Sequence, residues 1–379
     1  MSGNIARATR PGGPALVDRY EALLCDLDGV VYRGRDALPG AGPTLSRIVA
    51  HGIRLAYVTN NASRPPEVVA AQLRGLGAPT PPGCVVTSAQ AGAAHLRRLL
   101  PVGAAVVALG GPGVQQALKE EHLLAVPATR REAAAVLQGY GPDLRVSDFT
   151  EAARHVSKGA AWVATNSDAT VPVEWGVAPG NGSYVDVLRR ATGREPVVVG
   201  KPEPPLYELA IARLGTRRVL AVGDRLDTDI DGARAAGVDS AWALTGVDRP
   251  TDLVANPDRA LPTFVIGSLA DLERPYAVPV PTGSGWACGG AEARVQLVSG
   301  RPELVISAAS RSPTLAVVRA GLAALLEARA HDRSLLPALV AAAASLDALV
   351  DALVDALVDA QGDAEGDAEV DAVVEAAEG

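Results

Sequence analysis

Short apolar runs alternate with amphipathic stretches along most of the chain. Residues 22–25 form the clearest run, with the length of a buried strand, and residues 53–58 and 219–222 repeat the pattern. Between such runs, residues 43–51 and 206–214 carry apolar side chains at helical spacing. Strands and helices that alternate in this way build parallel sheets covered by helices. The pattern therefore predicts an α/β fold.

The same alternation continues from residue 84 to residue 194, but the polar signals described below fall on either side of this block. We therefore expect it to be a separate α/β domain inserted into the first. A stretch rich in Pro and Gly, residues 275–290, indicates a linker, and an amphipathic helix follows at residues 313–330. The predicted divisions are a flexible N-terminus (1–19), a core (20–84 and 195–274), the inserted domain (85–194), a small α+β module (285–344) and an acidic tail (345–379).

The acidity of the chain is concentrated at its end. The formal net charge is −8, but eleven of the 43 acidic residues lie in residues 345–379, which contain no Lys or Arg. The rest of the chain is nearly neutral, and aromatic residues are only 3% of the composition. No nucleic-acid surface is expected, because such a surface needs a basic patch with aromatic residues for stacking. In the tail an Asp-Ala-Leu-Val repeat begins at Asp347, and its four-residue period drifts against the helical turn, which predicts a partly helical, mobile tail.

Cysteine usage and hydropathy indicate a cytoplasmic protein. Cys25, Cys84 and Cys288 form no CxxC pair, which excludes a disulfide scaffold and a thiolate zinc site. Residues 1–20 lack the apolar core of a signal sequence, and the longest apolar run, residues 335–346, is too short and too rich in alanine to span a bilayer. No membrane is expected as a partner, and the sequence is compatible with a homodimer.

Two carboxylates stand where the first predicted strand ends. Asp26 and Asp28 follow the apolar run 22–25 and precede Gly29. Ligands of open parallel sheets bind beyond the carboxyl ends of the strands, so both acids are placed where chemistry is expected. Neighbouring buried carboxylates are costly unless a divalent cation or a cationic side chain balances them. The remainder of the site must therefore supply positive charge.

Three further signals follow predicted strands in the same way. Thr59, Asn60 and Asn61 end the second strand close to a helix start, where free backbone N–H groups favour an anion. Lys201 follows an apolar run in a chain that strongly prefers Arg to Lys, and residues 224–231 contain four acids, a composition typical of a hard-cation site. Taken singly, each signal is ordinary as a turn, a helix cap or a surface lysine. Their order, each at a strand end, favours one common site.

These residues permit phosphoryl transfer. Asp26 is the candidate nucleophile, which would form an aspartyl-phosphate, and Asp28 is the candidate acid and base for the leaving group and the water. Mg²⁺ shared by Asp26, the backbone carbonyl of Asp28 and Asp224 would neutralise the phosphate and align the attack. The candidates for holding the phosphate and offsetting its charge are Thr59, Asn60, Asn61 and Lys201.

Four motifs in this order resemble those of the haloacid dehalogenase-like (HAD) hydrolases. They are DLDGVVYRG from Asp26, VTNN from Val58, GKP from Gly200 and GDRLDTDI from Gly223. More narrowly, the motifs look like those of the NagD-like subfamily and of actinobacterial glycerol-3-phosphate phosphatases within it. The resemblance implies a Rossmann-like parallel-sheet core with an inserted α/β cap, Mg²⁺ as cofactor and hydrolysis of phosphomonoesters. It also implies that Asp229 supports the metal site.

The substrate is expected to be a small phosphorylated metabolite that the cap recognises. Asn166, Asp168 and Asn181 match segments that face the active site in relatives, although ordinary turns explain them equally well. Val171 stands where related pyridoxal-phosphate phosphatases have His, which argues against a pyridoxal ring. Glycerol 3-phosphate is the first expectation, and the alternatives are phosphoglycolate, a sugar phosphate, a nucleoside monophosphate and pyridoxal phosphate. An alternative of another class is a metabolite-binding or regulatory protein without turnover.

Overall fold

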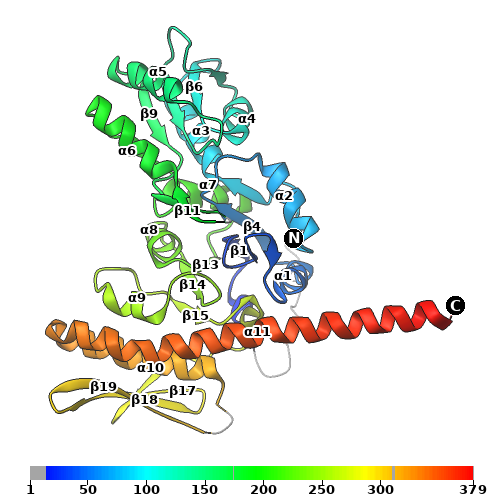
Figure 1. Cartoon of the computed structure of the whole chain (residues 1–379), viewed down its shortest axis with the longest axis vertical. Coiled ribbons are helices and arrows are strands. Elements are labelled where there is room, and N and C mark those ends of the chain that lie inside the picture. The colour runs from blue at the N-terminus through cyan, green and yellow to red at the C-terminus, as the bar shows by residue number, and fades with distance from the viewer. Residues whose placement is uncertain (1–13, 174, 310–311, 379) are drawn as a thin grey trace, which may run out of the picture.

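A parallel sheet lies in the middle of the molecule (Figure 1). The computed structural model describes residues 14–173, 175–309 and 312–378. Six parallel strands form this first sheet in the order β15-β14-β13-β1-β4-β5. Their bounds are β1 Ala22–Cys25, β4 Arg54–Thr59, β5 Val85–Thr87, β13 Val219–Gly223, β14 Asp239–Ala243 and β15 Phe264–Ile266. The predicted α/β core is confirmed.

Both faces of the first sheet are covered, which explains why its strands are continuously apolar. Leu23 and Cys25 of β1 are buried in the hydrophobic core on one face, and Ala22 and Leu24 in the core on the other. The helices next to these strands in the chain are α1 Ala41–Ala50, α2 Pro66–Gly75, α7 Pro204–Leu214, α8 Asp231–Ala235 and α9 Pro250–Ala255. Polar side chains are therefore left to the loops at the strand ends.

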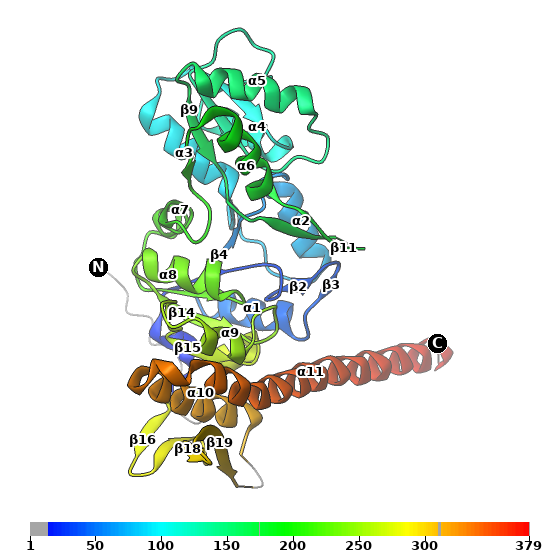
Figure 2. The same cartoon turned by 60° about the vertical axis from the view of Figure 1, so that its left-hand side comes forward.

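A second parallel sheet lies above the first in Figure 1. Its strands run in the order β12-β9-β8-β6-β7, with bounds β6 Ala105–Leu109, β7 Leu124–Val126, β8 Ala135–Gln138, β9 Ala161–Ala164 and β12 Val197–Val198. Four helices accompany it, α3 Ser88–Leu99, α4 Pro112–Glu120, α5 Val146–Ser157 and α6 Asn181–Thr192 (Figure 2). A hairpin of β10 Thr170–Val173 and β11 Gly176–Pro179 extends from this part. One hydrophobic core runs from Leu24 through Ala89 to Leu137, so the two sheets share packing.

Strand pairing shifts both edges of the predicted insertion. β5 begins at Val85 and pairs with β4 in the first sheet, whereas the sequence places residue 85 in the inserted domain. β12 pairs with β9 in the second sheet, although the sequence assigns residues 197 and 198 to the core. Both strands are only two or three residues long, so no periodic pattern indicates the sheet to which each belongs.

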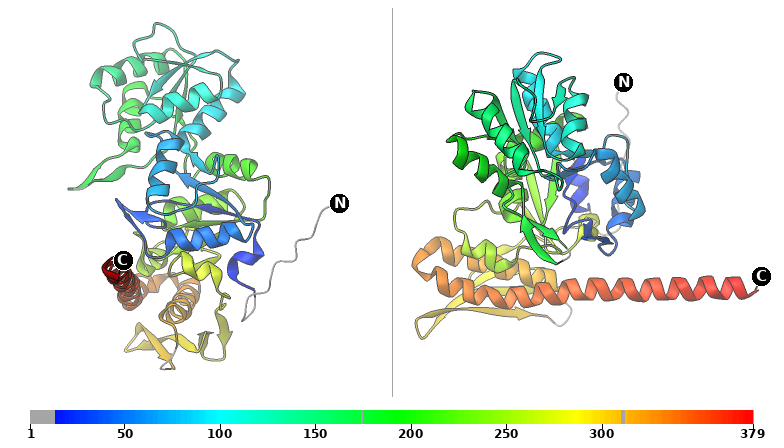
Figure 3. Two further views of the ribbon diagram at one scale, coloured as in Figure 1. Left: turned by 90° about the vertical axis from the view of Figure 1, so that its right-hand side faces the viewer. Right: turned by 45° about the horizontal axis from the view of Figure 1, so that its top comes forward.

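Four antiparallel strands and two long helices make up the C-terminal module (Figure 3). The strands are β16 Val280–Thr282, β17 Gly285–Cys288, β18 Ala291–Val298 and β19 Arg301–Ala308, paired in that order. Helix α10, Thr314–His331, packs on this sheet. Helix α11, Leu336–Glu378, packs on α10 and on α9, and its last part projects beyond the body of the molecule (Figure 1).

The predicted mobile tail is wrong for the residues that follow the module. The sequence places the boundary at residue 344, but α11 continues through it without a break. Leu346, Val350 and Val354 are buried in one hydrophobic cluster with Trp242 and Leu253. A four-residue repeat turns by about 40° each time around a helix, so three successive repeats still share one face. Packing of that face orders the start of the predicted tail.

The N-terminal prediction also needs correction. Residues 1–13 of the predicted flexible segment 1–19 lie outside the described residues. Leu16 and Val17, in a 3-10 turn at Leu16–Arg19, are fully buried. The Leu16 N–H donates to the Arg274 carbonyl at 2.9 Å. The core therefore begins before β1, because these two apolar side chains fill it.

One helical segment, Arg333–Ala360, is long and apolar enough to cross a membrane by its length and composition. The sequence predicts no such span. In the structure one face of this segment is buried inside the protein through Leu339, Ala343, Leu346, Val350 and Val354. That face packs on α9 and α10, and 28% of the most apolar window of the segment is buried inside the protein.

Candidate active site

The carboxyl ends of β1, β4 and β13 bring three of the predicted residues to one edge. Asp26 follows β1, Thr59 ends β4 and Asp224 follows β13. The Asp26 N–H donates to the Val222 carbonyl at 2.8 Å, which fixes Asp26 beside β13. Neighbouring parallel strands end at the same edge of a sheet, so residues far apart in the sequence meet here.

Three carboxylates form a compact cluster at this edge. One oxygen from each of Asp26, Asp224 and Asp229 lies within 4.8 Å of the other two. Lys201 Nζ donates to Asp26 Oδ1, to Asp229 Oδ1 at 2.7 Å and to the Val58 carbonyl at 3.2 Å. All three protons of the ammonium group are thus used, on a side chain only 4% exposed. One cation faces three carboxylates, so the cluster is short of positive charge.

Burial and mutual repulsion shift the ionisation of this cluster. Burial raises the pKa of Asp26 to about 7, with Lys201 opposing the shift and Asp229 adding to it. Burial also raises the pKa of Asp224 well above its usual range, helped by Asp229 and Asp26. Burial alone would lower the pKa of Lys201, but Asp229 and Asp26 hold it well above its usual value. Lys201 therefore stays cationic while the carboxylates compete for further positive charge.

Close backbone contacts hold Asp224. The Val247 N–H donates to Asp224 Oδ2 at 3.0 Å, and Trp242 Nε1 donates to the Asp224 backbone carbonyl at 3.0 Å. A Cβ at Gly246 would lie 1.9 Å from Asp224 Oδ2, and one at Gly29 would lie 2.5 Å from it. Gly29 also has a φ of +79°, which favours glycine. Glycine at these two positions lets both loops close around the carboxylate.

Asp28 lies just beyond the same strand end and outside the carboxylate cluster. Its side chain is exposed, and the Gly34 N–H approaches its Oδ1 at 3.4 Å. The sequence predicts a metal contact through its backbone carbonyl and an acid–base role for its carboxyl group. An exposed carboxyl group is open to both a leaving group and a water molecule, which that role requires.

Asn60 links the two sheets at this site. Its Oδ1 accepts from the Lys201 N–H at 2.8 Å, and its Nδ2 donates to the Lys201 carbonyl at 3.0 Å. The same Nδ2 lies 3.2 Å from both carboxylate oxygens of Asp168. The Asn61 N–H donates to Thr59 Oγ1 at 3.1 Å, which closes the turn. The Asn60 side chain thus holds Lys201 and Asp168, a role beyond the predicted phosphate contact.

The structure brings three of the four predicted cap residues into this network. Asp168 contacts Asn60 directly, and Asn166 Nδ2 donates to the Asn60 carbonyl at 2.8 Å. Asn181 Nδ2 donates to the Asn166 carbonyl at 2.8 Å, and its buried Oδ1 has no partner among the described residues. Val171 lies on β10 opposite Ala178 and belongs to the hairpin. Asn166 and Asn181 therefore support the turn that carries Asn60, and Asp168 lies nearer the cluster.

Arg225, Arg64 and Val247 lie beside the predicted residues and were not predicted. Arg225 makes two hydrogen bonds to Asp227, at 2.8 and 3.0 Å, and these together with the nearby Asp168 raise its pKa. The charge of Arg64 opposes the rise that burial causes in the pKa of Tyr32 in the first motif, and Val247 donates to Asp224. Arg225 stands inside the acid-rich loop and could have been found there, whereas the other two belong to loops without a recognisable pattern.

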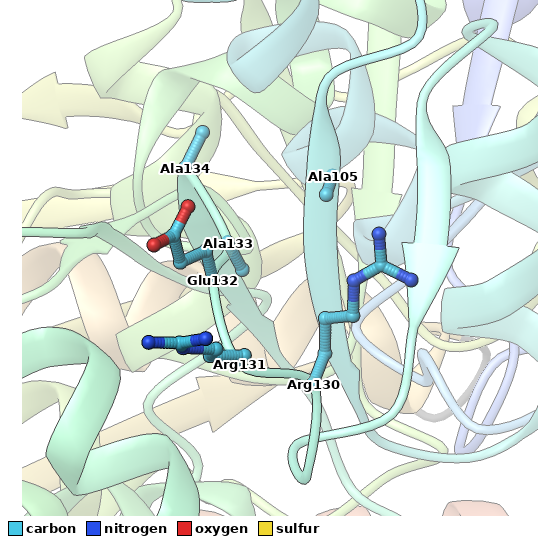
Figure 4. Close-up of a pocket in the computed structure, with 6 residues that line it drawn as sticks. All are labelled: Ala105, Arg130, Arg131, Glu132, Ala133 and Ala134. Carbon is cyan, nitrogen blue, oxygen red and sulfur yellow. The ribbon is translucent and has the colours of Figure 1, made fainter.

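A shallow depression at the far end of the second sheet is separate from this site. It has a volume of about 740 Å³ and is lined by Ala105, Arg130, Arg131, Glu132, Ala133 and Ala134 (Figure 4). Ala105 begins β6, and Ala134 directly precedes β8, so the depression lies at the amino ends of these strands. Figure 4 shows Arg130 and Arg131 pointing away from each other, so their guanidinium groups do not converge on one ligand.

Comparison with known proteins identifies relatives over most of the chain. A family model for haloacid dehalogenase-like hydrolases matches residues 23–123, and a HAD-hydrolase-like model matches residues 198–272. D-glycerol 3-phosphate phosphatase of Mycobacterium tuberculosis is 40% identical over 322 residues, which are 84% of this chain and 89% of that protein. Acid sugar phosphatase of Staphylococcus aureus is 37% identical over 237 residues, 62% of this chain and 90% of that protein.

Solved structures of phosphatases are also similar to this chain. A glycerol phosphate phosphatase from Mycobacterium tuberculosis, in complex with magnesium, superposes with a TM-score of 0.73 at 39% identity, over 83% of this chain and 92% of that chain. The p-nitrophenyl phosphatase from Archaeoglobus fulgidus gives a TM-score of 0.62 at 29% identity, over 67% of this chain and 98% of that chain. The predicted family is thereby confirmed, and the chain belongs to the haloacid dehalogenase-like hydrolases.

Proposed function

We propose that this enzyme hydrolyses phosphomonoesters with Mg²⁺ as its cofactor, and that glycerol 3-phosphate is its preferred substrate. The observation that carries the proposal is the cluster of Asp26, Asp224 and Asp229 around Lys201 at the carboxyl edge of the first sheet. The relatives named above, which are phosphatases, support it.

The donor set of the cluster fits Mg²⁺. Three carboxylates and one ammonium group leave excess negative charge, and hard oxygen donors are the ligands that Mg²⁺ prefers. Asp26, Asp224 and the backbone carbonyl of Asp28 would hold the ion, with Asp229 supporting the site through Lys201. When bound, Mg²⁺ neutralises the phosphate oxygens and so lowers the barrier to attack by an anion.

The reaction takes place in two steps on the residues that follow β1. The Asp26 carboxylate attacks phosphorus, the P–O ester bond breaks, and Asp28 gives its proton to the departing alkoxide. Asp28 then takes a proton from water, whose oxygen attacks the phosphorus, and the bond between phosphorus and Asp26 breaks. Inorganic phosphate leaves and both carboxyl groups are restored. Lys201 offsets the charge on Asp26, and the turn at Thr59 holds phosphoryl oxygens.

Two observations support glycerol 3-phosphate over the alternatives. The similarity to the mycobacterial enzyme spans 322 residues, which is more than residues 1–274 can supply, so the similarity extends into the C-terminal module. The similarity to the acid sugar phosphatase spans only 237 residues. Near the site, Asp168 carries two carboxylate oxygens that can accept hydrogen bonds from the hydroxyl groups of a polyol. The same carboxylate disfavours a substrate with a second anionic group, such as phosphoglycolate, because like charges repel.

A panel of phosphate esters tests the substrate. Phosphate release is measured with glycerol 3-phosphate, phosphoglycolate, pyridoxal phosphate, a hexose phosphate and a nucleoside monophosphate, each with saturating Mg²⁺. We expect kcat/KM for glycerol 3-phosphate to exceed the others by about tenfold or more. A preference for the hexose ester would overturn the substrate and leave the phosphatase standing. A preference for the pyridoxal ester would overturn the interpretation of Val171.

Asp26→Asn tests the mechanism and the alternative of a binding protein without turnover. The substitution keeps the shape of the side chain and removes the nucleophile, so we expect phosphate release to fall by about 10⁴-fold. Asp143→Asn, at an exposed loop position after β8, makes the same change in charge and should leave the rate unaltered. Full activity of Asp26→Asn would show that Asp26 is not the nucleophile, and no turnover of any ester by the unaltered chain would favour the binding protein.

A further inference from the structure

Helix α11 is tied to the loop that surrounds Asp224. Arg249 lies between them: its Nε donates to Asp351 of α11 at 3.0 Å, and its Nη1 donates to the Gly246 carbonyl at 2.8 Å. The same Nη1 approaches the Val247 and Asp248 carbonyls at 3.4 and 3.3 Å. One side chain therefore joins the C-terminal helix to three consecutive carbonyls, those of residues 246–248.

This loop in turn holds two parts of the acid-rich segment. The Val247 N–H donates to Asp224 Oδ2 at 3.0 Å, and Asp248 Oδ2 accepts from the Leu226 N–H at 2.6 Å. Gly246 approaches so closely that a Cβ there would lie 1.9 Å from Asp224 Oδ2. A small displacement of the loop would therefore move the Asp224 carboxylate or remove its hydrogen bond.

The C-terminal module also holds both ends of α9, which begins directly after the loop. At its start, Thr251 donates from N–H and from Oγ1 to the two Asp347 oxygens of α11, at 3.1 and 2.8 Å. At its end, Arg329 of α10 donates to the Leu253 and Val254 carbonyls at 2.6 and 3.1 Å. Arg329 is only 7% exposed, so this contact lies inside the interface. The loop and α9 are thus fixed as one unit.

We propose that Arg249 is a positioning residue for the metal site, and that α11, through Asp347 and Asp351, holds the 246–248 loop so that Asp224 is pre-set to bind Mg²⁺. The proposal rests on the magnesium site of the proposed function. A carboxylate that is already held by a backbone N–H loses little freedom on binding, and partners of this kind raise metal affinity without touching the ion. The C-terminal module then acts on cofactor affinity rather than on the chemical step.

The affinity of the full chain for Mg²⁺, measured by isothermal titration calorimetry, is the first test. Arg249→Met keeps the apolar stem and removes the guanidinium group, and we expect the Kd for Mg²⁺ to rise about tenfold. At saturating Mg²⁺, kcat and KM for glycerol 3-phosphate should change by less than about twofold, because Arg249 does not touch the substrate. Unfolding of the same variants in EDTA is recorded in parallel.

A double-mutant cycle tests whether α11 acts on Mg²⁺ binding through Arg249. Asp351→Ala alone should raise the Kd for Mg²⁺ by about threefold, and it should add nothing in the Arg249→Met background, because it acts through Arg249. Asp355→Ala, one turn further along α11 and exposed, is the matched control and should leave the Kd unchanged. Both are exposed helix positions, so these variants are expected to fold even where Arg249→Met does not.

The outcomes separate this inference from the proposed function. If the unaltered chain does not bind Mg²⁺, the magnesium site itself is wrong. If the unaltered chain binds and Arg249→Met binds equally well, the site stands and the positioning role is overturned. A lower unfolding temperature in EDTA with an unchanged Kd for Mg²⁺ would give Arg249 a structural role only. Additive effects of Asp351→Ala and Arg249→Met would overturn the path through α11.

Discussion

Lys201 shows at the scale of one residue why the site needs an ammonium group. Its three protons go to Asp26, to Asp229 and to the Val58 carbonyl, in a space from which water is nearly excluded. An ammonium group is compact and points its donors in three directions, whereas a guanidinium group is planar and larger. A chain that otherwise strongly prefers Arg therefore keeps a lysine where three acceptors converge.

We expect Lys201→Arg to lower kcat by about 10²-fold or more, although the charge is kept. The larger side chain cannot meet all three acceptors and overpacks the surroundings of a position whose side chain is only 4% exposed, which also lowers the unfolding temperature. Phosphate release and thermal unfolding are the measurements. Lys158→Arg, at an exposed position, makes the same change and should alter neither. More than half of the original rate in Lys201→Arg would contradict this account.

The buried carboxylates predict how the metal-free protein responds to pH. The folded-state pKa of Asp26, about 7, lies above the value of roughly 3.9 for an aspartate in an unfolded chain. Protonation of Asp26 therefore stabilises the fold fully below pH 4, and this contribution is lost as pH rises toward 7. The raised pKa of Asp224 acts in the same direction. In EDTA we expect the unfolding temperature to fall by about 5 °C between pH 5 and pH 8.

Mg²⁺ and Asp26→Asn are the controls for this pH dependence. Saturating Mg²⁺ should reduce the fall, because the ion binds the ionised carboxylates and its stabilising effect grows with pH. Asp26→Asn removes one of the titrating groups, so its unfolding temperature in EDTA should depend less on pH. An unfolding temperature that rises with pH in EDTA would contradict the raised pKa values.

Site residues could be predicted where a local sequence pattern determines their position in the fold. Asp26 and Asp224 stand directly after apolar runs, so their meeting at one sheet edge follows from the topology of a parallel sheet. Arg249 lies in a polar loop without periodicity, and its partner Asp351 is 102 residues away. The contact between Asn60 and Asp168 depends on how the two sheets are placed, which no local pattern contains.

At the scale of elements, α10 and α11 approach each other closely at Gly321. A Cβ at Gly321 would lie 2.8 Å from Leu346 Cδ2, and Leu346 is fully buried. We expect Gly321→Leu to push α11 away from α10 and to destabilise the C-terminal module by about 1–3 kcal/mol. Gly75→Leu is the matched control: it also lies in a helix, but its Cβ would meet nothing within 4 Å. Thermal unfolding is the measurement, and an equal loss in both variants would contradict close packing at Gly321.

Long elements with regular patterns could be predicted, and short strands could not. The helix expected at residues 313–330 is α10, Thr314–His331, and its length made it recognisable. The predicted amphipathic pattern is wrong, because residues 315–322 are all buried between the antiparallel sheet and α11. The hairpin of β10 and β11 was not predicted. Its strands are four residues long, and the residues of β11 are mostly exposed, so β11 has no alternating pattern of burial.

At the scale of the whole molecule, composition and packing disagree over residues 345–354. Their aspartates indicate a solvated tail, but the Leu and Val residues of the same repeat complete the hydrophobic cluster that contains Trp242 and Leu253. The aspartates of the same repeat make contacts of their own: Asp347 receives the hydrogen bonds of Thr251, and Asp351 that of Arg249. A repeat that combines buried Leu and Val residues with hydrogen-bonding aspartates can thus join the C-terminal module to the core.

Two truncated chains test where the folded body ends. A chain that ends at residue 360 keeps the buried face of α11 as well as Asp347 and Asp351, so its unfolding temperature should stay within about 2 °C of the full chain and its Mg²⁺ affinity should be unchanged. A chain that ends at residue 344 loses these residues and uncovers the cluster around Trp242. We expect its unfolding temperature to fall by more than about 5 °C and its Kd for Mg²⁺ to rise about tenfold.

The two chains also differ in what they leave exposed. The shorter one presents the apolar surface of α9 and α10 to solvent, so size-exclusion chromatography should show association, whereas the longer one should elute like the full chain. Since both lack the acidic end of the chain, a difference between them reports on residues 345–360 alone. If the chain that ends at residue 344 unfolds, elutes and binds Mg²⁺ like the full protein, residues 345–379 behave as the free tail that their composition predicts.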